Sequence, residues 1–533
     1  MDNFSRTQII RKAVIPTRGG IVAAAHRRAA EVGAAVLDAG GDAVDAAVAV
    51  SFAIGVVEPW MSGPAGAGAM VLWRAKEGRA RVVDYGARSP MGLDPADYPL
   101  AGGIVTDELF PWLRVVGDRN VSGATAVAVP GVVDGMGLAH AEYGRLPWSE
   151  LLAPAVRLAQ DGLLVDWFFT LLTASVARSL AADPDTARMF LDDGNWPISG
   201  HWTFGSDRHL DQRAMAATLD RLARNGPREF YEGEVARALV ADLARKGSAM
   251  AEADLAGYHA RIVDAQIVPY RGGRIFVAPG LTGGPTLAHA LGILASELTP
   301  AHEKPGAASY VAYARALEAA FNARFAAMGD AAGIAEPAHA PSCTTHFNVV
   351  DRDGNMCAVT QTLLSIFGSR VVSPTTGLLM NNGIMWFDPE PGKPNSLAPG
   401  KRCLANFCPV IGEGRDGRRF ALGASGGRKI IGAVLQIISF IVDHGMTLED
   451  AFHQQRIDMS GSAKALADRT LPQPVLDALA KAFPTTTALR TSFPYAFAHP
   501  AAVLREGELN MGCTEIMSPW GDAVAEGTGT AVR

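Results

Sequence analysis

A run of threonines at the start of a predicted strand, Thr344-Thr345-His346, contains residue types that could form a covalent bond with a substrate. An internal threonine hydroxyl is a poor nucleophile, because no base lies beside it. If the peptide bond before Thr344 is cut, the freed α-amine, with a pKa of about 8, accepts the hydroxyl proton. One residue then supplies both nucleophile and base. On residue pattern alone, the same run is also ordinary for a structural strand.

Two other motifs that often carry chemistry are not supported. Residues 63–68, Gly-Pro-Ala-Gly-Ala-Gly, suggest a phosphate loop, but the spacing differs from GxGxxG and no lysine follows to complete a Walker-type loop. We therefore interpret this segment as a structural glycine turn. The sequence contains no HExxH pair, so a zincin is unsupported.

The elements that must position the threonines can be predicted from turn signals. Residues 344–350 and 356–363 read as two strands, and Asp353-Gly354 between them predicts a β-hairpin. Residues 331–342, immediately before the hairpin, are mostly small and show no periodicity. They are predicted to form a connector, which is where chain processing tends to occur.

The rest of the chain mixes helices with strands. Residues 26–39 read as a helix closed by Gly40-Gly41, and Asp42 is a suitable N-cap for a second, apolar helix that ends near Val57. Four more segments are predicted from periodicity: strands at 71–73 and 81–85, a mostly helical stretch from Pro147 to about Ala327, and a helix at 430–442. Helices and strands in both halves predict an α/β or α+β protein, organised as one composite domain.

Composition narrows the function classes further. The chain has 533 residues, 48% hydrophobic and 19% charged, so it can form a large core, and its net charge of −6 gives no general attraction to nucleic acid or to an anionic membrane. The densest apolar stretches, 46–57 and 430–442, fall short of the roughly 20 residues that a membrane helix needs. The first 12 residues lack the apolar core of a secretory signal, and none of the five cysteines forms a CxxC pair. These features predict a cytoplasmic protein with reduced thiols.

Several motifs, in collinear order, resemble the γ-glutamyltransferase family. The small-subunit part of that resemblance is carried by Thr344-Thr345-His346-Phe347, by 351–355 and 359–363, and by 378–382, 394–395, 401–402 and 423–427. The large-subunit part is carried by 40–46, 56–59, 128–131 and 230–233. The matching region runs from about residue 19 to about residue 450.

The resemblance implies an N-terminal-nucleophile hydrolase with a four-layer αββα sandwich of the α+β class, built by both halves of the chain. Such a protein is made as a proenzyme that cuts itself before the nucleophilic threonine. Here that bond would be Cys343–Thr344, which divides the chain into a large subunit, 1–343, and a small subunit, 344–533. Cys343 is expected to be a spectator, because the cut leaves it at a carboxyl terminus.

The resemblance also implies roles for particular residues. Thr344 becomes the nucleophile and, through its α-amine, the base. Thr362 matches the threonine whose hydroxyl supports the nucleophile from the neighbouring strand. Gly426 and Gly427 match the pair whose backbone N–H groups form an oxyanion hole.

The residues expected to bind the acyl group differ from the family pattern. The arginine that would bind an α-carboxylate aligns with Gly86, and Arg88, two residues later, is the candidate replacement. The family's serine pair falls on Ala405-Asn406, and an expected asparagine becomes Leu364. The motif Asn-Asn-Gln-x-x-Asp reads Asn381 to Trp386. Arg88, Asn382, Trp386 and Asn406 are therefore the candidate substrate-binding residues. Arg370, Arg402, Arg428 and Lys429 are further cations that could bind a carboxylate.

These differences leave the donor open. The leading hypothesis is a self-processing threonine amidohydrolase or acyltransferase that cleaves a γ-glutamyl or similar amide. The first alternative is an acylase with a non-glutamyl donor, of the glutaryl, cephalosporin or oxamate type. An alternative of another class is an inert relative that only binds. The expected partner is a small-molecule amide, and no metal, organic cofactor, nucleic acid or membrane is expected. The sequence leaves open whether two processed heterodimers associate.

Overall fold

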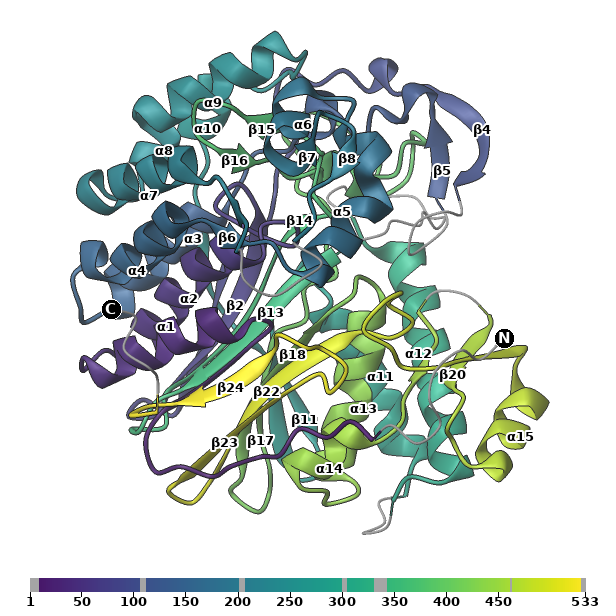
Figure 1. Cartoon of the computed structure of the whole chain (residues 1–533). Helices are drawn as coiled ribbons and strands as arrows, with labels where there is room; N and C mark the ends of the chain where they lie inside the picture. Colours follow the sequence, from purple (N-terminus) through teal and green to yellow (C-terminus); the bar gives the residue numbers. More distant parts are fainter. Residues whose placement is uncertain are drawn as a thin grey trace.

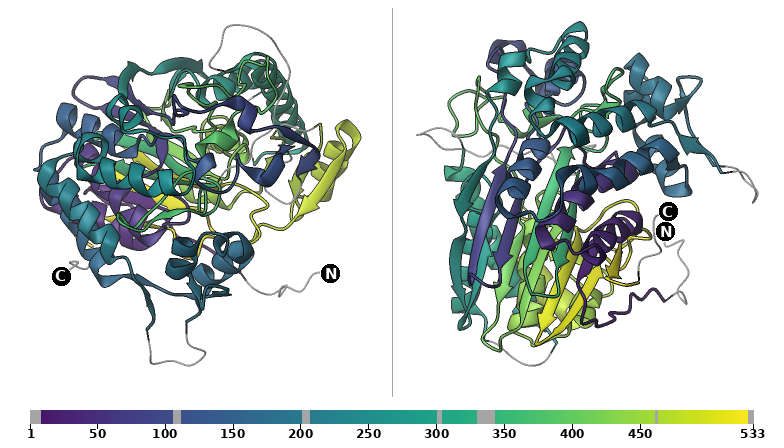
Figure 2. Two further views of the ribbon diagram at one scale, coloured as in Figure 1. Left: turned by 90° about the horizontal axis from the view of Figure 1, so that it is seen from above. Right: turned by 90° about the vertical axis from the view of Figure 1, so that its left-hand side faces the viewer.

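Two stacked sheets form the centre of the molecule, and helices cover their outer faces (Figures 1 and 2). The computed structural model describes residues 9–105, 112–200, 207–299, 304–329, 343–460 and 463–528. This arrangement is the αββα sandwich, and it confirms the predicted α+β fold class. The predicted connector, 331–342, lies outside the described residues.

The first sheet combines strands from both halves of the chain. It has seven strands, in the spatial order β10 (Arg261–Asp264), β3 (Arg79–Tyr85), β2 (Ala67–Arg74), β14 (Met356–Leu364), β13 (Cys343–Val350), β1 (Ile21–Ala24) and β24 (Asp522–Ala525). The strands on both sides of β13 run antiparallel to it, with Val350 opposite Met356 of β14 and Ile21 of β1. The strand that starts with the threonine run is thus held between the two halves of the chain.

The second sheet is also antiparallel. Its six strands follow the order β11 (Gln266–Tyr270), β12 (Gly273–Val277), β17 (Val410–Glu413), β18 (Arg419–Ser425), β22 (His499–Glu506) and β23 (Leu509–Thr514). The two sheets approach closely where β13 crosses β18, since a Cβ at Gly423 would lie 2.2 Å from Cε1 of His346. A side chain at residue 423 would therefore push the sheets apart at this point.

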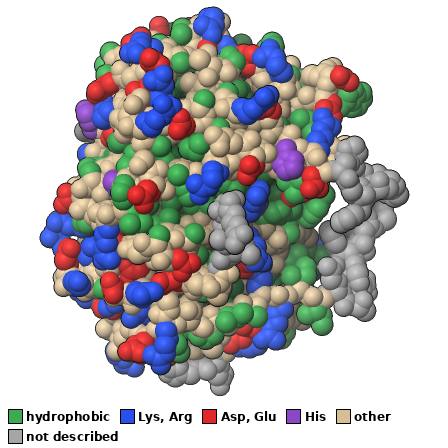
Figure 3. Space-filling model, turned by 60° about the vertical axis from the view of Figure 1, so that its left-hand side comes forward, with side chains coloured by type: hydrophobic (Ala, Val, Ile, Leu, Met, Phe, Trp, Pro, Cys, Tyr) green, Lys and Arg blue, Asp and Glu red, His purple; other side chains and the backbone are tan. Residues whose placement is uncertain are grey.

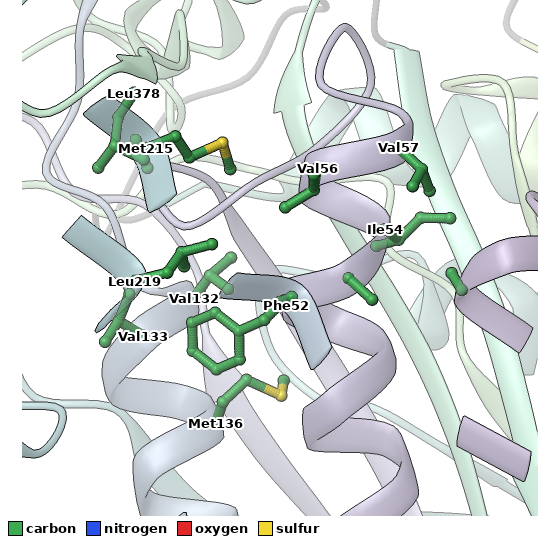
Figure 4. Close-up of a cluster of buried hydrophobic side chains, with 14 of the residues drawn as sticks. Phe52, Ile54, Val56, Val57, Val132, Val133, Met136, Met215, Leu219 and Leu378 are labelled. Atoms are coloured by element: carbon green, nitrogen blue, oxygen red, sulfur yellow. The ribbon is translucent and has the colours of Figure 1, made fainter. Parts of the chain in front are cut away.

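Helices from the N-terminal half cover the first sheet. They include α1 (Arg27–Asp38), α2 (Ala43–Val57), α3 (Val132–Tyr143), α4 (Trp148–Asp161) and α7 (Arg213–Asn225). Every residue of α2 is buried, as its apolar sequence requires. Figure 4 shows Phe52 of α2 next to Val132, Val133 and Met136 of α3 and Leu219 of α7.

A second helical layer covers the other sheet. It consists of α11 (Gly284–Glu297), α12 (Ala307–Ala327) and α13 (Lys429–Val442). The buried apolar residues accordingly form three main clusters: one beneath each helical layer and one between the sheets. The sandwich is held together mainly by these three apolar layers, because burial of apolar surface is the dominant favourable term in folding.

The caps predicted at Gly40-Gly41 and Asp42 are present, and Gly40 has a positive φ of 92° just after α1. The N-cap of α1 is His26, predicted as the first helical residue, and its Nδ1 accepts from the N–H of Arg28. Asp42 is the N-cap of α2 and forms a capping box with Asp45. The predicted strands at 71–73 and 81–85, the hairpin and the helix at 430–442 are confirmed, with slightly different ends.

The stretch from 147 to 327 is mostly helical, as predicted, and holds α4 to α12. It also contains β10, β11 and β12, which extend an edge of each sheet and which the sequence did not predict. These strands have four or five residues each, and Pro269 lies within β11, an edge strand, where a missing N–H is tolerated. Such short runs between helices carry little periodicity of their own.

The remaining elements are small and peripheral to the sandwich. The short strand pairs and small sheet are β4 (Leu100–Val105) with β5 (Trp112–Val115), β6 (Leu163–Leu164) with β9 (His209–Leu210), β7 (Leu191–Asp192) with β8 (Trp196–Pro197), β15 (Val372–Ser373) with β16 (Leu378–Leu379), and β19 (Ile457–Asp458) with β20 (Ala465–Asp468) and β21 (Thr485–Ala488). The further α-helices are α5 (Trp167–Leu180), α6 (Pro184–Phe190), α8 (Glu229–Glu232), α9 (Glu234–Arg245), α10 (Glu252–Ala256), α14 (Leu448–His453) and α15 (Gln473–Ala482). Four 3₁₀ turns are η1 (Pro95–Asp97), η2 (Val116–Asp118), η3 (Ala124–Ala126) and η4 (Gly383–Trp386).

Among the described residues, no helix combines the length and the apolar character needed to cross a bilayer. On the face drawn in Figure 3, acidic and basic side chains of the described residues are interspersed, and no broad patch of one sign is visible.

Candidate active site

Thr344 is the second residue of β13 and lies at one end of the sandwich, where it lines a cavity of about 400 Å³. Its side chain is 2% exposed. The ladder between β13 and β14 is irregular here: Cys343 pairs with Leu364, whereas Thr345 pairs with Gln361. Two residues of β14 therefore oppose Thr344, a β-bulge of the kind that often re-aims side chains next to active sites.

Thr362 is one of the two residues opposite Thr344. Its hydroxyl oxygen accepts a hydrogen bond of 2.8 Å from the N–H of Leu364. That bond closes a tight turn at the end of β14, where Leu364 has a φ of 88°. A left-handed conformation is costly for a leucine, and such strain is common beside functional sites. The structure thus places Thr362 next to Thr344, as the sequence predicts, and gives its hydroxyl a defined orientation.

Gly426 and Gly427 form the turn between β18 and α13. Their φ angles of 124° and 63° lie in the region that favours glycine. Among the described residues, the N–H groups of these two glycines donate to no hydrogen-bond acceptor. They lie just before the N-terminus of α13, where the helix dipole favours negative charge. The turn therefore offers unpaired N–H donors at the same end of the sandwich as Thr344.

Glu58 caps the C-terminal end of α2 and lines the same cavity. It is 7% exposed, and its Oε2 accepts a hydrogen bond of 2.8 Å from the hydroxyl of Thr345. No described cation forms an ion pair with it. Burial raises the pKa of Glu58 to about 7, although the hydrogen bond from Thr345 acts in the opposite direction. A carboxyl group with a pKa near neutrality thus contacts Thr345, the residue that follows Thr344 in the chain.

The histidines of the site are held in the neutral form. Burial lowers the pKa of His346 to about 3, and its two ring nitrogens contact Thr360 Oγ1 at 2.9 Å and Asn348 Oδ1 at 3.0 Å. Asn348 in turn donates to the carbonyl of Ala501, which joins the two sheets. Burial likewise lowers the pKa of His499, which also lines the cavity, to about 4.

The predicted acyl-contact residues Asn382, Trp386 and Asn406 do not line this cavity. Asn382 is fully buried, and its amide bonds the N–H and Oγ of Ser365 and the carbonyl of Val121. Trp386 is 1% exposed and packs against Phe407 between the sheets, with ring centroids 5.1 Å apart. These contacts give both side chains a structural role in the unbroken chain.

Asn406 is held by a buried arginine. Its Oδ1 accepts from Arg324 Nη2 at 3.1 Å, and Arg324 also donates to the carbonyls of Thr282 and Ala405. Burial lowers the pKa of Arg324 to about 10. Arg324 is not among the residues identified from the sequence, because it lies on α12, outside every motif.

Arg88 is half-buried, it forms no ion pair with a described carboxylate, and its buried Nε has no hydrogen-bond partner among the described residues. Arg370, a further predicted cation, is 6% exposed. Arg402 pairs with Asp84 at 2.6 Å, and Lys429 donates to the carbonyl of Ala496 at 2.9 Å. Arg428 lies over the ring of Phe325, 4.7 Å from its centroid. Of these cations, Arg88 is the one best placed to receive an anion.

The run from Gly423 to Gly427 also has the spelling of a serine-hydrolase nucleophile elbow, GxSxG, in a strand–turn–helix context. Ser425 lines the cavity, but its hydroxyl donates to the carbonyl of His499 at 3.4 Å, and no imidazole hydrogen-bonds to it. A serine without a base beside it is a weak nucleophile. The geometry therefore favours Thr344 over Ser425.

Comparisons with known proteins agree with this arrangement. The sequence matches the family model described as Gamma-glutamyltranspeptidase over residues 29–339 and 331–516. It is 33% identical over 491 residues to an Acylase ACY 1 proenzyme from Pseudomonas sp. (strain V22), with 86% of each chain covered. It is also 33% identical over 484 residues to a glutathione hydrolase proenzyme from Pseudomonas aeruginosa, with 82% of each chain covered.

A solved structure supports the fold. The crystal structure of cephalosporin acylase from Bacillus halodurans superposes with a TM-score of 0.84 at 24% sequence identity, covering 98% of this chain and 99% of that one. Because the family match spans most of the chain and the two curated relatives exceed 30% identity, the family assignment does not depend on the fold alone. The chain belongs to the gamma-glutamyltranspeptidase family and is an enzyme of its amide-hydrolysing and acyl-transferring type.

Proposed function

We propose that this chain is a proenzyme that cuts itself between Cys343 and Thr344 and then hydrolyses an amide through an acyl-enzyme on Thr344. The observation that carries the proposal is that Thr344 lines a cavity with Thr362 opposite it on β14, and that Ser425, which directly precedes the unpaired N–H groups of Gly426 and Gly427, lines the same cavity. The proenzyme names of the Pseudomonas acylase and glutathione hydrolase support the self-cleavage. The product would be a heterodimer of residues 1–343 and 344–533.

Each chemical step has a residue to perform it. The α-amine of the processed Thr344 accepts the hydroxyl proton, and Oγ attacks the amide carbon. The oxyanion that forms is bound by the N–H groups of Gly426 and Gly427, and each such donor is worth about 3 kcal/mol in comparable sites. The C–N bond breaks, and the α-ammonium returns its proton to the departing amine. Water then cleaves the Thr344 ester by the same route, or an amine replaces water in transfer.

The donor is proposed to lack an α-ammonium. A γ-glutamyl group carries a carboxylate and an ammonium, and the ammonium needs hydrogen-bond acceptors that are free to accept. Asn382 and Asn406 are occupied by Ser365 and Arg324, while Leu364 and Trp386 are apolar. An acyl group with one carboxylate, such as glutaryl, needs only a single cation, and Arg88 can supply it as a bidentate partner.

The processing step can be tested by intact-mass measurement of the purified protein. We expect two pieces of 343 and 190 residues, because the cut divides the 533-residue chain before Thr344. Thr344→Ala should stay a single chain and lose all turnover, whereas Thr344→Ser keeps a hydroxyl and should retain some processing. A Thr344→Ala variant that still splits or still turns over substrate would refute the proposal. A full-length, inactive wild type would favour the inert binding relative.

The donor can be tested by comparing kcat/KM of the processed enzyme for γ-glutamyl and glutaryl anilides. We expect the glutaryl anilide to be preferred. If the γ-glutamyl anilide is preferred by about tenfold or more, which corresponds to about 1.4 kcal/mol in transition-state binding, residues other than those named here must bind the ammonium.

A further inference from the structure

The cavity beside Thr344 has an aromatic wall that the catalytic steps above do not use. Trp60 and Phe168, which are 4% and 6% exposed, come from the N-terminal half, and Trp520 comes from the connection between β23 and β24. Phe168 and Trp520 stack with centroids 4.5 Å apart and an interplanar angle of 25°. The centroids of Trp60 and Phe168 are 6.4 Å apart. The wall therefore exists only when both halves of the chain are folded together.

The aromatic surface continues to the mouth of the cavity. Trp167 is 59% exposed, and its ring lies 5.1 Å from that of Trp520. Leu164, which lines the cavity, is 41% exposed. Large apolar side chains that are exposed together beside a cavity are typical of ligand-binding sites.

The charged groups around the cavity leave its interior with little net charge. His26, His346 and His499 are neutral at pH 7, because burial lowers the pKa of each to about 4 or below. Glu515 is neutralised by Arg456 at 2.6 Å and Arg490 at 3.5 Å. The remaining titratable lining residues are Glu58, described above, Asp166, which caps α5, Tyr495, which is half-buried, and Arg28, Asp207 and His209, which are exposed.

One polar atom of the wall lacks a partner. The indole N–H of Trp60 is buried and forms no hydrogen bond within the described residues. A buried donor without an acceptor is costly, so a ligand that brings an acceptor to this point would be favoured. The wall thus suits a planar apolar group that carries a hydrogen-bond acceptor.

The residues predicted to contact the acyl group lie outside this cavity. The cavity is lined by residues that follow β1, by the start of β22, by the end of β23, and by residues of the segment 57–61, whose backbone bonds the end of β14. Asn382 bonds Ser365 just after β14, Arg88 follows β3, and neither residue lines the cavity. If the acyl group lies towards Arg88, as proposed above, the cavity is left for the amine portion of an amide whose carbonyl lies at Thr344.

We propose that this cavity binds the amine portion of the amide substrate, and that this portion is a bulky, uncharged aromatic group with a hydrogen-bond acceptor. The proposal rests on the proposed function for the position of the scissile bond. It assigns a leaving-group subsite formed by Trp60, Phe168 and Trp520. The family assignment alone does not indicate an aromatic leaving group.

The test compares two amides that share one acyl-enzyme, the glutaryl amides of 7-amino-4-methylcoumarin and of methylamine, on the processed enzyme. Trp520→Ala should lower kcat/KM about tenfold for the coumarin amide, as expected for loss of an aromatic contact. The methylamide and the deacylation rate should be unchanged. Trp60→Phe keeps an aromatic six-membered ring but removes the pyrrole ring with its N–H, and should cost a few-fold for the coumarin amide alone. The control is Trp196→Ala, which removes a 70% exposed tryptophan of β8 that does not line the cavity.

Equilibrium dialysis of free 7-amino-4-methylcoumarin provides a readout that needs no turnover. The Kd should weaken about tenfold in Trp520→Ala and stay unchanged in Trp196→Ala. Equal losses for both amides, or a Kd that is insensitive to Trp520, would overturn the subsite. If the wild type binds the coumarin in a Trp520-dependent way but cleaves no amide, the proposed function is wrong and the aromatic site stands.

Discussion

The two sides of Thr344 differ in how their residues are used. On the side proposed for the acyl group, Asn382 and Asn406 are polar by sequence, but their amides are bonded to Ser365 and Arg324. On the side of the cavity, the space is open, and its wall contains aromatic rings. A polar residue in a family motif is therefore not by itself a ligand contact, because a buried amide must first satisfy its own hydrogen bonds.

Contacts between distant segments form both sides, but with different chemistry. The amide of Asn382 bonds Ser365, 17 positions away, and the carbonyl of Val121, 261 positions away, and Asn406 bonds Arg324, 82 positions away. Phe168 and Trp520 come from opposite halves of the chain and meet only when the sandwich closes. Folding therefore pairs the polar groups on one side, the filled side, and forms an aromatic wall on the other, the open side.

The largest expected effect is a difference in stability between variants of two tryptophans, Trp386 on the filled side and Trp520 on the side of the cavity. Trp386→Ala should lower the free energy of unfolding by about 3–5 kcal/mol, because it removes a buried ring from the core between the sheets. Trp520→Ala, at the partly exposed wall, should lower it by about 1 kcal/mol. Denaturant unfolding of both variants in the Thr344→Ala background checks this. A Trp386→Ala protein as stable as its parent would mean that this side is not filled by structural packing.

Arg88 tests whether the filled side still receives an anion. Arg88→Met should lower kcat/KM for glutaryl anilide by up to about a hundredfold, since hydrogen bonds to a charged group are worth about 1.5–3 kcal/mol. The neutral butyryl anilide should be nearly unaffected. The matched control is Arg28→Met, which removes an exposed arginine at the mouth of the cavity. Similar losses for both anilides would show that Arg88 maintains the fold and does not bind the acyl carboxylate.

Glu58 tests the electrostatics of the open side. Burial raises its pKa from 4.5 to about 7 in the folded chain, so the folded state binds a proton that the unfolded state releases. The contribution of protonated Glu58 to the free energy of unfolding is therefore fully present below pH 4.5. It is lost as the pH rises through 7, where the buried carboxyl must ionise. The comparison uses the uncut Thr344→Ala protein as the parent. Between pH 5 and pH 8, the free energy of unfolding of Glu58→Gln should rise by roughly 2 kcal/mol relative to that of this parent.

Thermal unfolding of the Glu58→Gln pair at several pH values provides the measurement. Glu508→Gln, in an exposed ion pair with Arg18, is the control and should show no such trend. A difference between Glu58→Gln and its parent that stays constant from pH 5 to pH 8 would contradict the raised pKa.

The smallest expected effect concerns Thr362, which lies at the boundary between the two sides. Thr362→Val keeps the shape but removes the hydroxyl that orients the turn at Leu364, and processing and turnover should both slow about tenfold. Thr362→Ser keeps the hydroxyl and should restore most of the rate. Time courses of chain cleavage and of glutaryl anilide hydrolysis provide the two readouts. Unchanged rates in Thr362→Val would remove the supporting role from this residue.

The sequence by itself determined the elements whose signals are local. The glycines at 40 and 41 set the end of α1, Asp42 set the start of α2, and the Asp353-Gly354 turn set the β13–β14 hairpin. The threonine run and the glycine pair also identified the catalytic candidates. These features depend on neighbouring residues, so the spacing of apolar residues and the identity of cap and turn residues are enough to predict them.

Only the tertiary structure decided which predicted residues are free to act. Glu58 and Thr345 are 287 positions apart in sequence, and their hydrogen bond forms because α2 ends against the start of β13. The same folding occupies Asn382 and Asn406, leaves Arg88 without an ion pair, and closes an aromatic wall around Thr344. Burial and pairing depend on contacts between distant segments, and a pattern of residues along the chain does not contain them.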